Sequence, residues 1–477
     1  MSRRPAFVIA GLIALLALSF ALAGPRYPGA MWPIDFRAFY CAGTVAAGGG
    51  DPYRIEPLRT CENASWGFPP GRGLPFAVPA PLPGYALAPF ALLSRLPFPV
   101  AAGVWAALLL ASLALTIALM SRLCERRVET IFAALMLQGL YAVFLGQIVP
   151  IVCAAAVAAA FFVTRGRDRL AALAATVAML EPHLGLPVCL ALFIARPRSR
   201  AVLAACGVGF ALVSLALLGV GTNVEYLRDV LPAHTLSEIS NAEQYSLAYL
   251  AHLAGAGERA AGALGTVSYI LMLVAGIFAG RIAAARTGLA ALLVLVPPAF
   301  AVLGGPFVHV QQLAIALPAA LVLSGTRAPG ARLGSVAVML LAVLWPATGF
   351  MILNLPAFAG VIFVLAIDLF GWPLAGAGLA SVASMAFLIA LLVTRGDAPE
   401  PLIGPIAPGP GTALAEDGWR SYVEASFSGS VASLTAAKLL GWSGLILIAI
   451  AAFGSNRRTP ELHGKQGRAV RRLDHRV

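Results

Sequence analysis

The segment "IDFRAFYCAGTVAAGGGDPY", residues 34–53, places an acid, an arginine and aromatic residues directly after the first apolar run of the chain. Its first half favours a short helix, because Pro33 precedes it and a glycine run follows it. At helical spacing Asp35, Phe39 and Ala42 share one face, so the Asp35 carboxylate could face a cavity and act as a general base. The alternative is that Asp35 only caps this helix.

Further polar residues stand at the ends of other apolar runs. An ionisable group within or beside a membrane span is a functional hypothesis by default, because its burial there is costly unless it is paired or hydrated. His309 is the strongest case, since it lies between a Gly-Gly-Pro break and two glutamines. The full set is Asp35, Arg37, Gln147, Glu181, His183, Glu225, Asp229, His234, Glu238, Glu243, Gln244, His309, Gln311 and Gln312.

A structural role competes with a functional one at most of these positions. Gln147 could satisfy backbone groups at a tight turn, and His183 could be a neutral core histidine bonded to a carbonyl. For Glu181 an ion pair with a nearby arginine is the favoured role, ahead of catalysis. His234 and His252 have the pattern of ordinary loop or interfacial residues.

The composition requires a membrane environment for these residues. The 477 residues are 60% hydrophobic and only 11% charged, whereas an ordinary soluble domain is about 25% charged. Apolar runs near 20 residues long, flanked by arginines, match a hydrocarbon core of about 30 Å. The formal net charge of +12 comes largely from arginine clusters between these runs, which is the positive-inside pattern and argues against nucleic-acid binding.

We expect an all-α polytopic membrane protein with about 12–14 spans of ~20 residues each. Arg3 and Arg4 favour a cytoplasmic N-terminus, and counting by alternation makes both termini cytoplasmic. The first run favours a retained anchor, although "ALAG" at 21–24 resembles a signal cleavage site. The expected spans lie near 5–24, 98–121, 130–147, 148–164, 170–182, 184–195, 201–220, a run ending near Arg281, 287–303, 307–325, 333–350, 356–371, 374–394 and 438–453.

The same count divides the chain into three parts. Residues 1–325 form a transmembrane catalytic module, whose extracytoplasmic loops at about 25–97 and 221–260 carry short helices. Residues 326–456 add C-terminal transmembrane helices and a third outer loop at about 395–437, of unassigned role. Residues 457–477 form a basic cytoplasmic tail.

The six cysteines show no zinc-ligand spacing. Cys41 and Cys61 both fall in the first outer loop, an oxidising place in a bacterium, where they either form a disulfide or remain buried thiols. The other four lie in or beside apolar spans and are expected to behave as small core hydrophobes.

Several segments resemble, in the same order, the bacterial GT87 (DUF2029-type) membrane glycosyltransferases. The first-loop segment at 34–53 resembles their Asp- and Tyr-containing motif, and "PAPLPGYALAPFALLSRLP" at 79–97 resembles their Pro-rich re-entry into the membrane. "EPHLGL" resembles a family Lys-Pro motif in which Glu181 replaces the lysine and reverses the charge. The resemblance covers about residues 1–325 and also includes "LGQIVPIV", "NAEQYSLAYL" and "GGPFVHVQQLAIALPAAL".

The resemblance implies a GT-C-like bundle in a bacterial inner membrane. It implies inverting transfer of a mannose- or arabinose-like sugar from a polyprenyl-phosphate donor to a lipid or glycan acceptor on the extracytoplasmic side. Asp35 matches the position of the family's catalytic aspartate, and His309, Arg37 and Gln147 are candidates to hold the donor phosphate. Gln311, His183 and Tyr40 complete the expected binding residues. No Asp-x-Asp motif is present, so we expect no required metal or other cofactor.

Two other functions share parts of this pattern. A polytopic transporter or flippase for a glycolipid would place its site near the bilayer midplane on paired broken helices, and "EPHLG" at 181–185 is one such break without an obvious mate. A ligase moving a whole glycan from a lipid diphosphate would share the architecture and need a larger pocket. A non-catalytic scaffold is the remaining alternative.

Overall fold

The computed structural model describes residues 4–23, 33–69, 72–241, 244–326, 330–343, 355–395, 404–405, 412–427 and 431–454. Glu243 and the expected tail at 457–477 lie outside these ranges. The described chain is almost entirely helical, with one short antiparallel pair of strands, β1 (Arg72–Gly73) and β2 (Gly404–Pro405). The expectation of an all-α membrane protein is confirmed.

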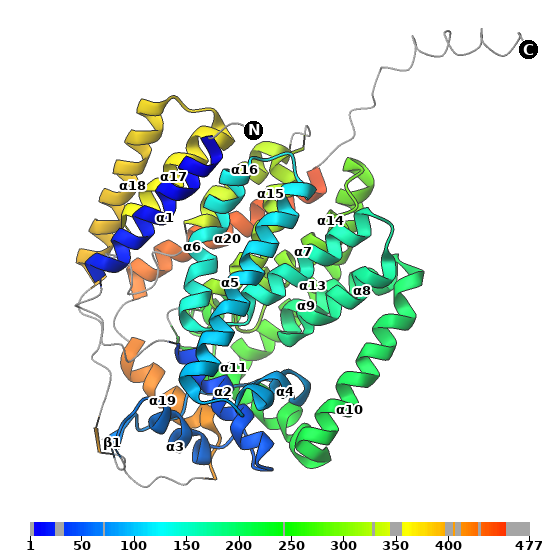
Figure 1. Cartoon of the computed structure of the whole chain (residues 1–477), viewed down its shortest axis with the longest axis vertical. Helices are drawn as coiled ribbons and strands as arrows, with labels where there is room; N and C mark the ends of the chain where they lie inside the picture. Colours follow the sequence, from blue (N-terminus) through cyan, green and yellow to red (C-terminus); the bar gives the residue numbers. More distant parts are fainter. Residues whose placement is uncertain are drawn as a thin grey trace, which may run out of the picture.

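Apolar helices make up the body of the molecule (Figure 1). Backbone groups in hydrocarbon have no water to bind, so a spanning segment must satisfy them within a helix. By length and composition, four described helices could cross a membrane: α5 (Phe98–Leu123), α6 (Val128–Leu145), α13 (Glu258–Thr287) and the continuous helical stretch Pro197–Ser237, which contains α10 (Arg200–Glu225). Shorter apolar stretches, of 10–17 described residues, are α4 (Gly84–Leu93), α7 (Val149–Thr164), α9 (Pro182–Ala195), α14 (Leu292–Gly304), the stretch Val310–Ser324 that contains α15 (Leu317–Ser324), α16 (Gly330–Ala342), and parts of α1 (Arg4–Ala23), α17 (Leu355–Phe370), α18 (Leu374–Arg395) and α20 (Val431–Gly454). Helix α8 (Asp168–Val177) lies between α7 and α9 in the chain.

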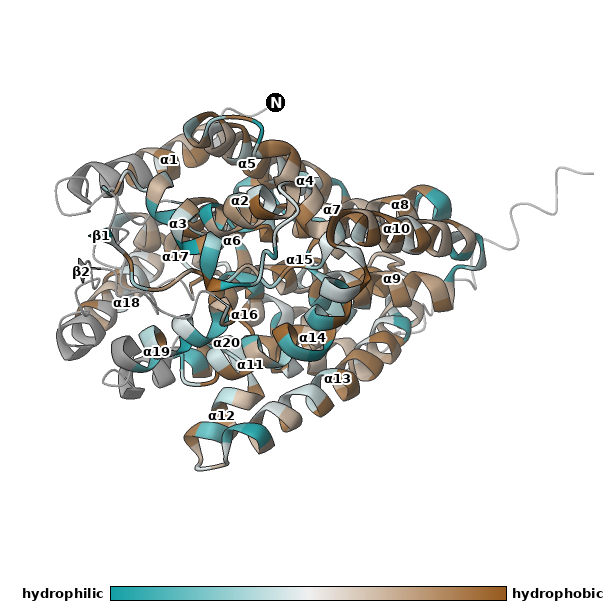
Figure 2. Ribbon diagram, turned by 90° about the horizontal axis from the view of Figure 1, so that it is seen from below, coloured by the Kyte–Doolittle hydropathy of each residue, from teal (hydrophilic) through white to brown (hydrophobic). Residues whose placement is uncertain are grey.

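The outer surface of this body is apolar. Seen from below, the rim helices α9, α10 and α13 are mostly brown, the colour of hydrophobic residues (Figure 2). On α10 the side chains of Val208 and Leu212 are each 61% exposed, and on α13 that of Leu271 is 61% exposed. Large exposed apolar side chains over several turns are the surface that lipid tails solvate.

Five short helices gather at the end of the bundle opposite the N-terminus (Figure 1). We call this the short-helix end; its members are α2 (Ile34–Ala47), α3 (Ile55–Ser65), α4 (Gly84–Leu93), α11 (Leu231–Ser237) and α19 (Ala415–Phe427). A Cys41–Cys61 disulfide joins α2 to α3, which resolves the alternative that the sequence left open. Such a cross-link reduces the conformational entropy of the unfolded chain and so favours the folded arrangement of these two helices.

Helix α2 is fixed by close packing against its neighbours. Phe36 is fully buried and stacks on Trp105 with ring centroids 5.6 Å apart. The indole nitrogen of Trp105 donates to the carbonyl of Gly146, at 2.8 Å. A Cβ at Gly43 would lie 2.5 Å from the backbone of Phe90, so α4 crosses α2 where no side chain fits. These contacts hold α2 beside the tip of the hairpin formed by α6 and α7.

The C-terminal part packs back onto the rest of the chain. Helix α16 contacts α15 and α20, and α20 also contacts α13 and α14. At the short-helix end, Arg72 pairs with Pro405 in the β1–β2 ladder, and Arg54 forms an isolated bridge with Leu414. The described part of the third loop therefore lies against the first loop.

The close approach at Gly146 yields a first prediction. Its backbone has φ +78°, and an added Cβ would lie 2.5 Å from the Cβ of Phe36. Gly166 has a similar φ of +66° but open space around it, so it is a matched control. Both changes to alanine should cost about 1–2 kcal/mol of backbone strain. Gly146→Ala should cost about 1–3 kcal/mol more, because α2 must shift.

Thermal unfolding of the two purified variants in detergent measures this difference. We expect Gly146→Ala to lower the midpoint clearly more than Gly166→Ala. Equal midpoints would show that α2 does not depend on this contact.

Candidate functional site

A cavity of about 790 Å³ opens at the short-helix end. Its walls come from α2, the segment 78–82, the hairpin tip at Gln147, the break at 181–183, α11, α13, the turn before α15, and α19. Ligand sites in proteins typically combine apolar walls with a few placed polar groups. The polar and hydroxyl-bearing lining residues are Asp35, Tyr141, Gln147, Glu181, His183, Tyr226, His234, Thr235, Glu238, Asn241, Arg259, Thr266, Tyr269, His309, Gln311, Gln312 and Tyr422.

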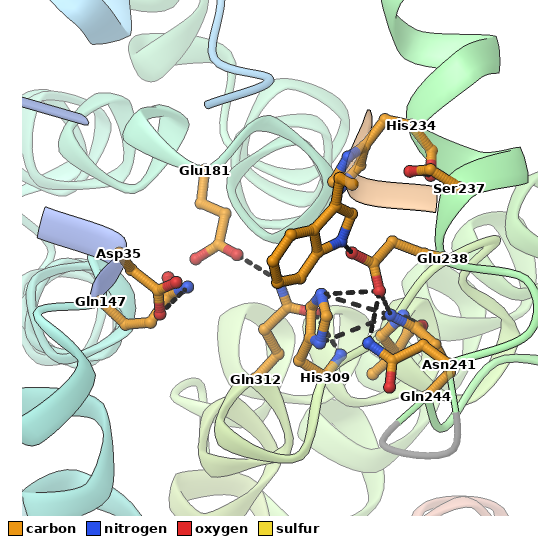
Figure 3. Close-up of polar contacts among 12 residues, drawn as sticks. Asp35, Gln147, Glu181, His234, Ser237, Glu238, Asn241, Gln244, His309 and Gln312 are labelled. Atoms are coloured by element: carbon orange, nitrogen blue, oxygen red, sulfur yellow. Dashed lines mark hydrogen bonds and ion pairs between the residues drawn. The ribbon is translucent and has the colours of Figure 1, made fainter. Parts of the chain in front are cut away.

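Asp35 and Gln147 form a contact at one side of the cavity (Figure 3). The side-chain amide nitrogen of Gln147 donates to Oδ2 of Asp35, at 2.8 Å. Helix α2 begins at Ile34, so Asp35 lies in its first turn and not in the capping position before it, which Pro33 occupies. Asp35 is therefore not the N-cap residue, although an acid in the first turn still interacts favourably with the positive end of the helix dipole. Gln147 reaches Asp35 because α6 ends at the left-handed Gly146, where the chain reverses direction.

A second carboxylate lies where the sequence breaks between α8 and α9. Glu181 is 6% exposed and accepts a hydrogen bond from the side-chain amide of Gln312 (Figure 3). The expectation that Glu181 pairs with an arginine is wrong, because its described neighbours are this amide and Nε2 of His183, 3.8 Å away. Pro182, which has no backbone N–H, is the first residue of α9, so Glu181 and His183 both lie at the start of this helix.

The third carboxylate, Glu238, is the centre of a hydrogen-bond network (Figure 3). Asn241 donates to its Oε2 at 2.7 Å and Gln244 to the same atom at 3.2 Å. The indole nitrogen of Trp419 donates to Oε1 at 2.5 Å. Burial raises the pKa of Glu238, but His309, His234 and the bonds from Asn241 and Trp419 outweigh it, so the pKa lies below its ordinary value. Glu238 is therefore a buried anion held by neutral donors and histidines.

His309 is held beside this network by both backbone and side chain. Its Nε2 lies 3.9 Å from Oε2 of Glu238 and 3.2 Å from the amide nitrogen of Gln244. Its backbone N–H donates to the side chain of Gln312 at 2.9 Å, which is one half of a capping box. The imidazole is 22% exposed and lines the cavity together with Gln311.

The structure brings together five of the seven residues expected in the site: Asp35, Gln147, His183, His309 and Gln311. Arg37 and Tyr40 do not line the cavity. The Arg37 guanidinium donates to Ser65 at 2.6 Å and lies 3.8 Å above the ring of Trp66, and burial lowers its pKa to about 10, against the influence of Glu62. The Tyr40 hydroxyl donates to the carbonyl of Leu96. We therefore leave Arg37 and Tyr40 out of the proposed site.

Sequence reasoning did not single out several lining residues. Glu238 belongs to the expected set of polar residues beside the spans but has no specific role there, and Trp419 and Tyr422 lie in the third loop, to which the sequence assigns no role. Their three-residue spacing in a helix puts both rings on one face, which is the one feature of the sequence that could have indicated them. Arg259, in the first turn of α13, is the one lysine or arginine among the described residues that line the cavity.

The comparison with protein-family models assigns part of this architecture. Residues 81–306 match the model of glycosyltransferase family 87. The resemblance seen in the sequence is thus confirmed over this range, a little under half of the chain, and it supports transfer of a sugar. Neither the curated proteins nor the solved structures contain a match to the chain. Asp35, His309 and α19 lie outside the matched residues, so their inclusion in the site rests on the geometry above.

No group of three or more His, Cys, Asp or Glu side chains among the described residues is arranged to hold a metal ion. The cavity has three histidines, His183, His234 and His309, and each lies near a carboxylate or a ring.

Glu416, in the first turn of α19, gives a second prediction. It is 2% exposed, its Oε2 has no hydrogen-bond partner among the described residues, and burial raises its pKa from 4.5 to about 8. Because the folded pKa is above the unfolded one, the folded state retains a proton that the unfolded state releases. Stability should therefore fall as the pH rises from about 4.5 to about 8.

Glu416→Gln should flatten this fall, whereas the exposed neighbour change Asp417→Asn should not. Thermal midpoints of the three proteins between pH 5 and pH 9 provide the measurement. Parallel curves for wild type and Glu416→Gln would show that Glu416 does not titrate in this way.

Proposed function

We propose that the protein transfers a sugar from a polyprenyl-phosphate donor to an acceptor hydroxyl, with inversion, in the cavity at the short-helix end. The observation that carries the proposal is that Asp35 and His309 line the same cavity. In the sequence they are separated by 273 residues, which include most of the membrane helices. A base for the acceptor and a group for the leaving phosphate are the two functions that this reaction needs. The family match over 81–306 supports the reaction class.

Asp35 is the proposed general base. Its Oδ2 accepts a hydrogen bond from Gln147, which fixes the plane of the carboxylate toward the cavity. Such a base typically contributes 10²–10⁴-fold to the rate. In the reaction, the acceptor hydroxyl gives its proton to Asp35 and its oxygen bonds to the anomeric carbon. The bond from that carbon to the phosphate oxygen breaks, and the lipid phosphate leaves with the electron pair.

His309 is the proposed partner of the leaving phosphate, with Gln311, Gln147 and His183 as further contacts. In its protonated form the imidazole is a cation balanced by Glu238, at 3.9 Å. Groups that are already oriented toward developing charge cost no reorganisation during the reaction. The backbone and Gln244 contacts of His309 supply that orientation. The proposal needs no resident metal or other cofactor.

The proposed setting is a bacterial inner membrane, with both termini in the cytoplasm and the cavity open to the periplasm. Arginine clusters at 122–127, 165–169 and 196–200 follow α5, α7 and α9, whereas the cavity lies at the opposite ends of these helices. This separation of charge supports the orientation through the positive-inside rule. A lipid-linked donor must be met at the membrane surface, which fits a cavity near helix ends.

Sugar transfer by Asp35→Asn tests the proposal. Membranes or purified protein would be supplied with labelled polyprenyl-phosphate mannose, arabinose or glucose. We expect at least a 10²-fold loss of rate, because the amide cannot accept the acceptor proton. Asp229→Asn is the matched control, since Asp229 lies outside the cavity lining, has a side chain that is 41% exposed and pairs with Arg228.

The control should retain wild-type rates. Transfer by Asp35→Asn at a near wild-type rate would remove Asp35 as the base. Absence of transfer by the wild type from every donor would instead favour a transporter or flippase.

A further inference from the structure

One wall of the cavity is aromatic and comes from outside the family-matched residues. Trp419 and Tyr422 of α19 both line the cavity, and each is partly exposed. The match to glycosyltransferase family 87 ends at residue 306. The family match therefore assigns no role to this wall.

The two rings are held in place by a third. The ring of Tyr422 stacks on Phe76 with centroids 4.3 Å apart and planes at 29°. The ring of Trp419 meets that of Phe76 edge-on, with centroids 5.7 Å apart, and is tilted by 38° against that of Tyr422, with centroids 5.3 Å apart. Phe76 itself is only 6% exposed, so it forms a rigid base. Aromatic clusters of this kind fix ring positions and lose little entropy when a ligand covers them.

Polar groups border this aromatic surface. The indole N–H of Trp419 is bound to Glu238, which also accepts from Asn241. Asn241 and Gln311 line the same cavity. A sugar ring has an apolar face of C–H groups and an edge of hydroxyls, so it fits a surface that offers an aromatic plane beside carboxylate and amide groups.

The opposite side of α19 argues against a lipid tail as the occupant. Arg420 pairs with Glu258 at 2.5 Å and with Glu424 at 2.8 Å, and Asp417, Ser421 and Glu424 are exposed. A helix with charged residues on its outer side lies in water and not in hydrocarbon. A polyprenyl chain has to leave the cavity toward the lipid-facing helices, away from this wall.

We propose that Trp419 and Tyr422, backed by Phe76, form a stacking platform for a sugar ring of one of the two substrates. The inference rests on the proposed transferase function and adds a binding element from the C-terminal third of the chain. The ring belongs either to the donor or to the acceptor, and both share the chemistry that the platform recognises.

Steady-state kinetics of paired substitutions test the platform. Tyr422→Leu keeps apolar bulk but removes the ring, whereas Tyr422→Phe keeps the ring. We expect Tyr422→Leu and Trp419→Ala to raise one KM about 10-fold, as loss of about 1.4 kcal/mol of binding would do. Tyr422→Phe should stay within a few-fold of wild type, and so should the control Trp372→Ala, because Trp372 is 46% exposed outside the cavity lining.

Two assays identify which ring is bound. Polyprenyl-phosphate mannose, arabinose or glucose supplied without acceptor reports donor use through transfer to water, and methyl glycosides of the same sugars report acceptor use. A raised KM in the first assay assigns the platform to the donor sugar, and one confined to the second assigns it to the acceptor.

Unchanged KM values in both assays for Tyr422→Leu would overturn the proposal, and so would equal losses in Tyr422→Leu and Tyr422→Phe. A binding measurement distinguishes failure of the platform proposal from failure of the proposed reaction. Calorimetric titration of folded Asp35→Asn with the same donors and methyl glycosides, with and without Tyr422→Leu, needs no turnover. Weaker binding in the double variant supports the platform even if no transfer occurs, and equal binding overturns it.

Discussion

Every buried carboxylate that faces the cavity needs a hydrogen-bond donor within the protein, because close packing keeps bulk water away from most of the carboxylate. The structure meets this requirement with amides. Gln147 serves Asp35, Gln312 serves Glu181, and Asn241 with Gln244 serves Glu238. An amide satisfies the hydrogen bonding of a carboxylate without supplying a charge of its own. Two of these bonds join segments that are distant in sequence: one ties α2 to the hairpin tip, and the other ties the broken helix pair to the turn before α15.

Hydropathy and charge predicted the long apolar helices and their order, because the cost of an unpaired backbone in lipid leaves a long apolar segment no other conformation. Most expected apolar runs overlap a described helix, but their bounds differ. The run expected at 307–325 is a 3-10 segment, Val310–Ala316, followed by α15, and residues 344–350 of the run expected at 333–350 lie outside the described part of the chain. The short helix α2 was also predicted, from Pro33 and the glycine run that bound it. The Cys41–Cys61 pairing could not be decided from sequence, since spacing alone does not give the distance between two helices.

The site was only partly predictable, and helical geometry explains the difference. Asp35 and Phe39 are four residues apart and both reach the cavity, whereas Arg37 is two residues from Asp35 and points to another side of α2, toward Trp66. Tyr40 is similarly turned away, toward Leu96. Their place in a motif suggested a shared role that their position on the helix does not allow. Glu181 is a different case: the sequence favoured an arginine as its partner, whereas the structure gives it the side-chain amide of Gln312.

The third loop shows why no local pattern could have described the whole cavity. Trp419 reaches Glu238 across 181 residues of sequence, and the strand pairing of Gly404–Pro405 with Arg72–Gly73 carries the loop toward the first one. The family-matched residues supply the hairpins, the broken helix pair and the second loop, but the acid at the start of α2, the histidine before α15 and the aromatic wall come from either side of them. In the proposed reaction the base and the ring-binding surface therefore come from separate segments, and we expect a change in α19 to alter which sugar is held without moving Asp35 or Gln147, which orients it.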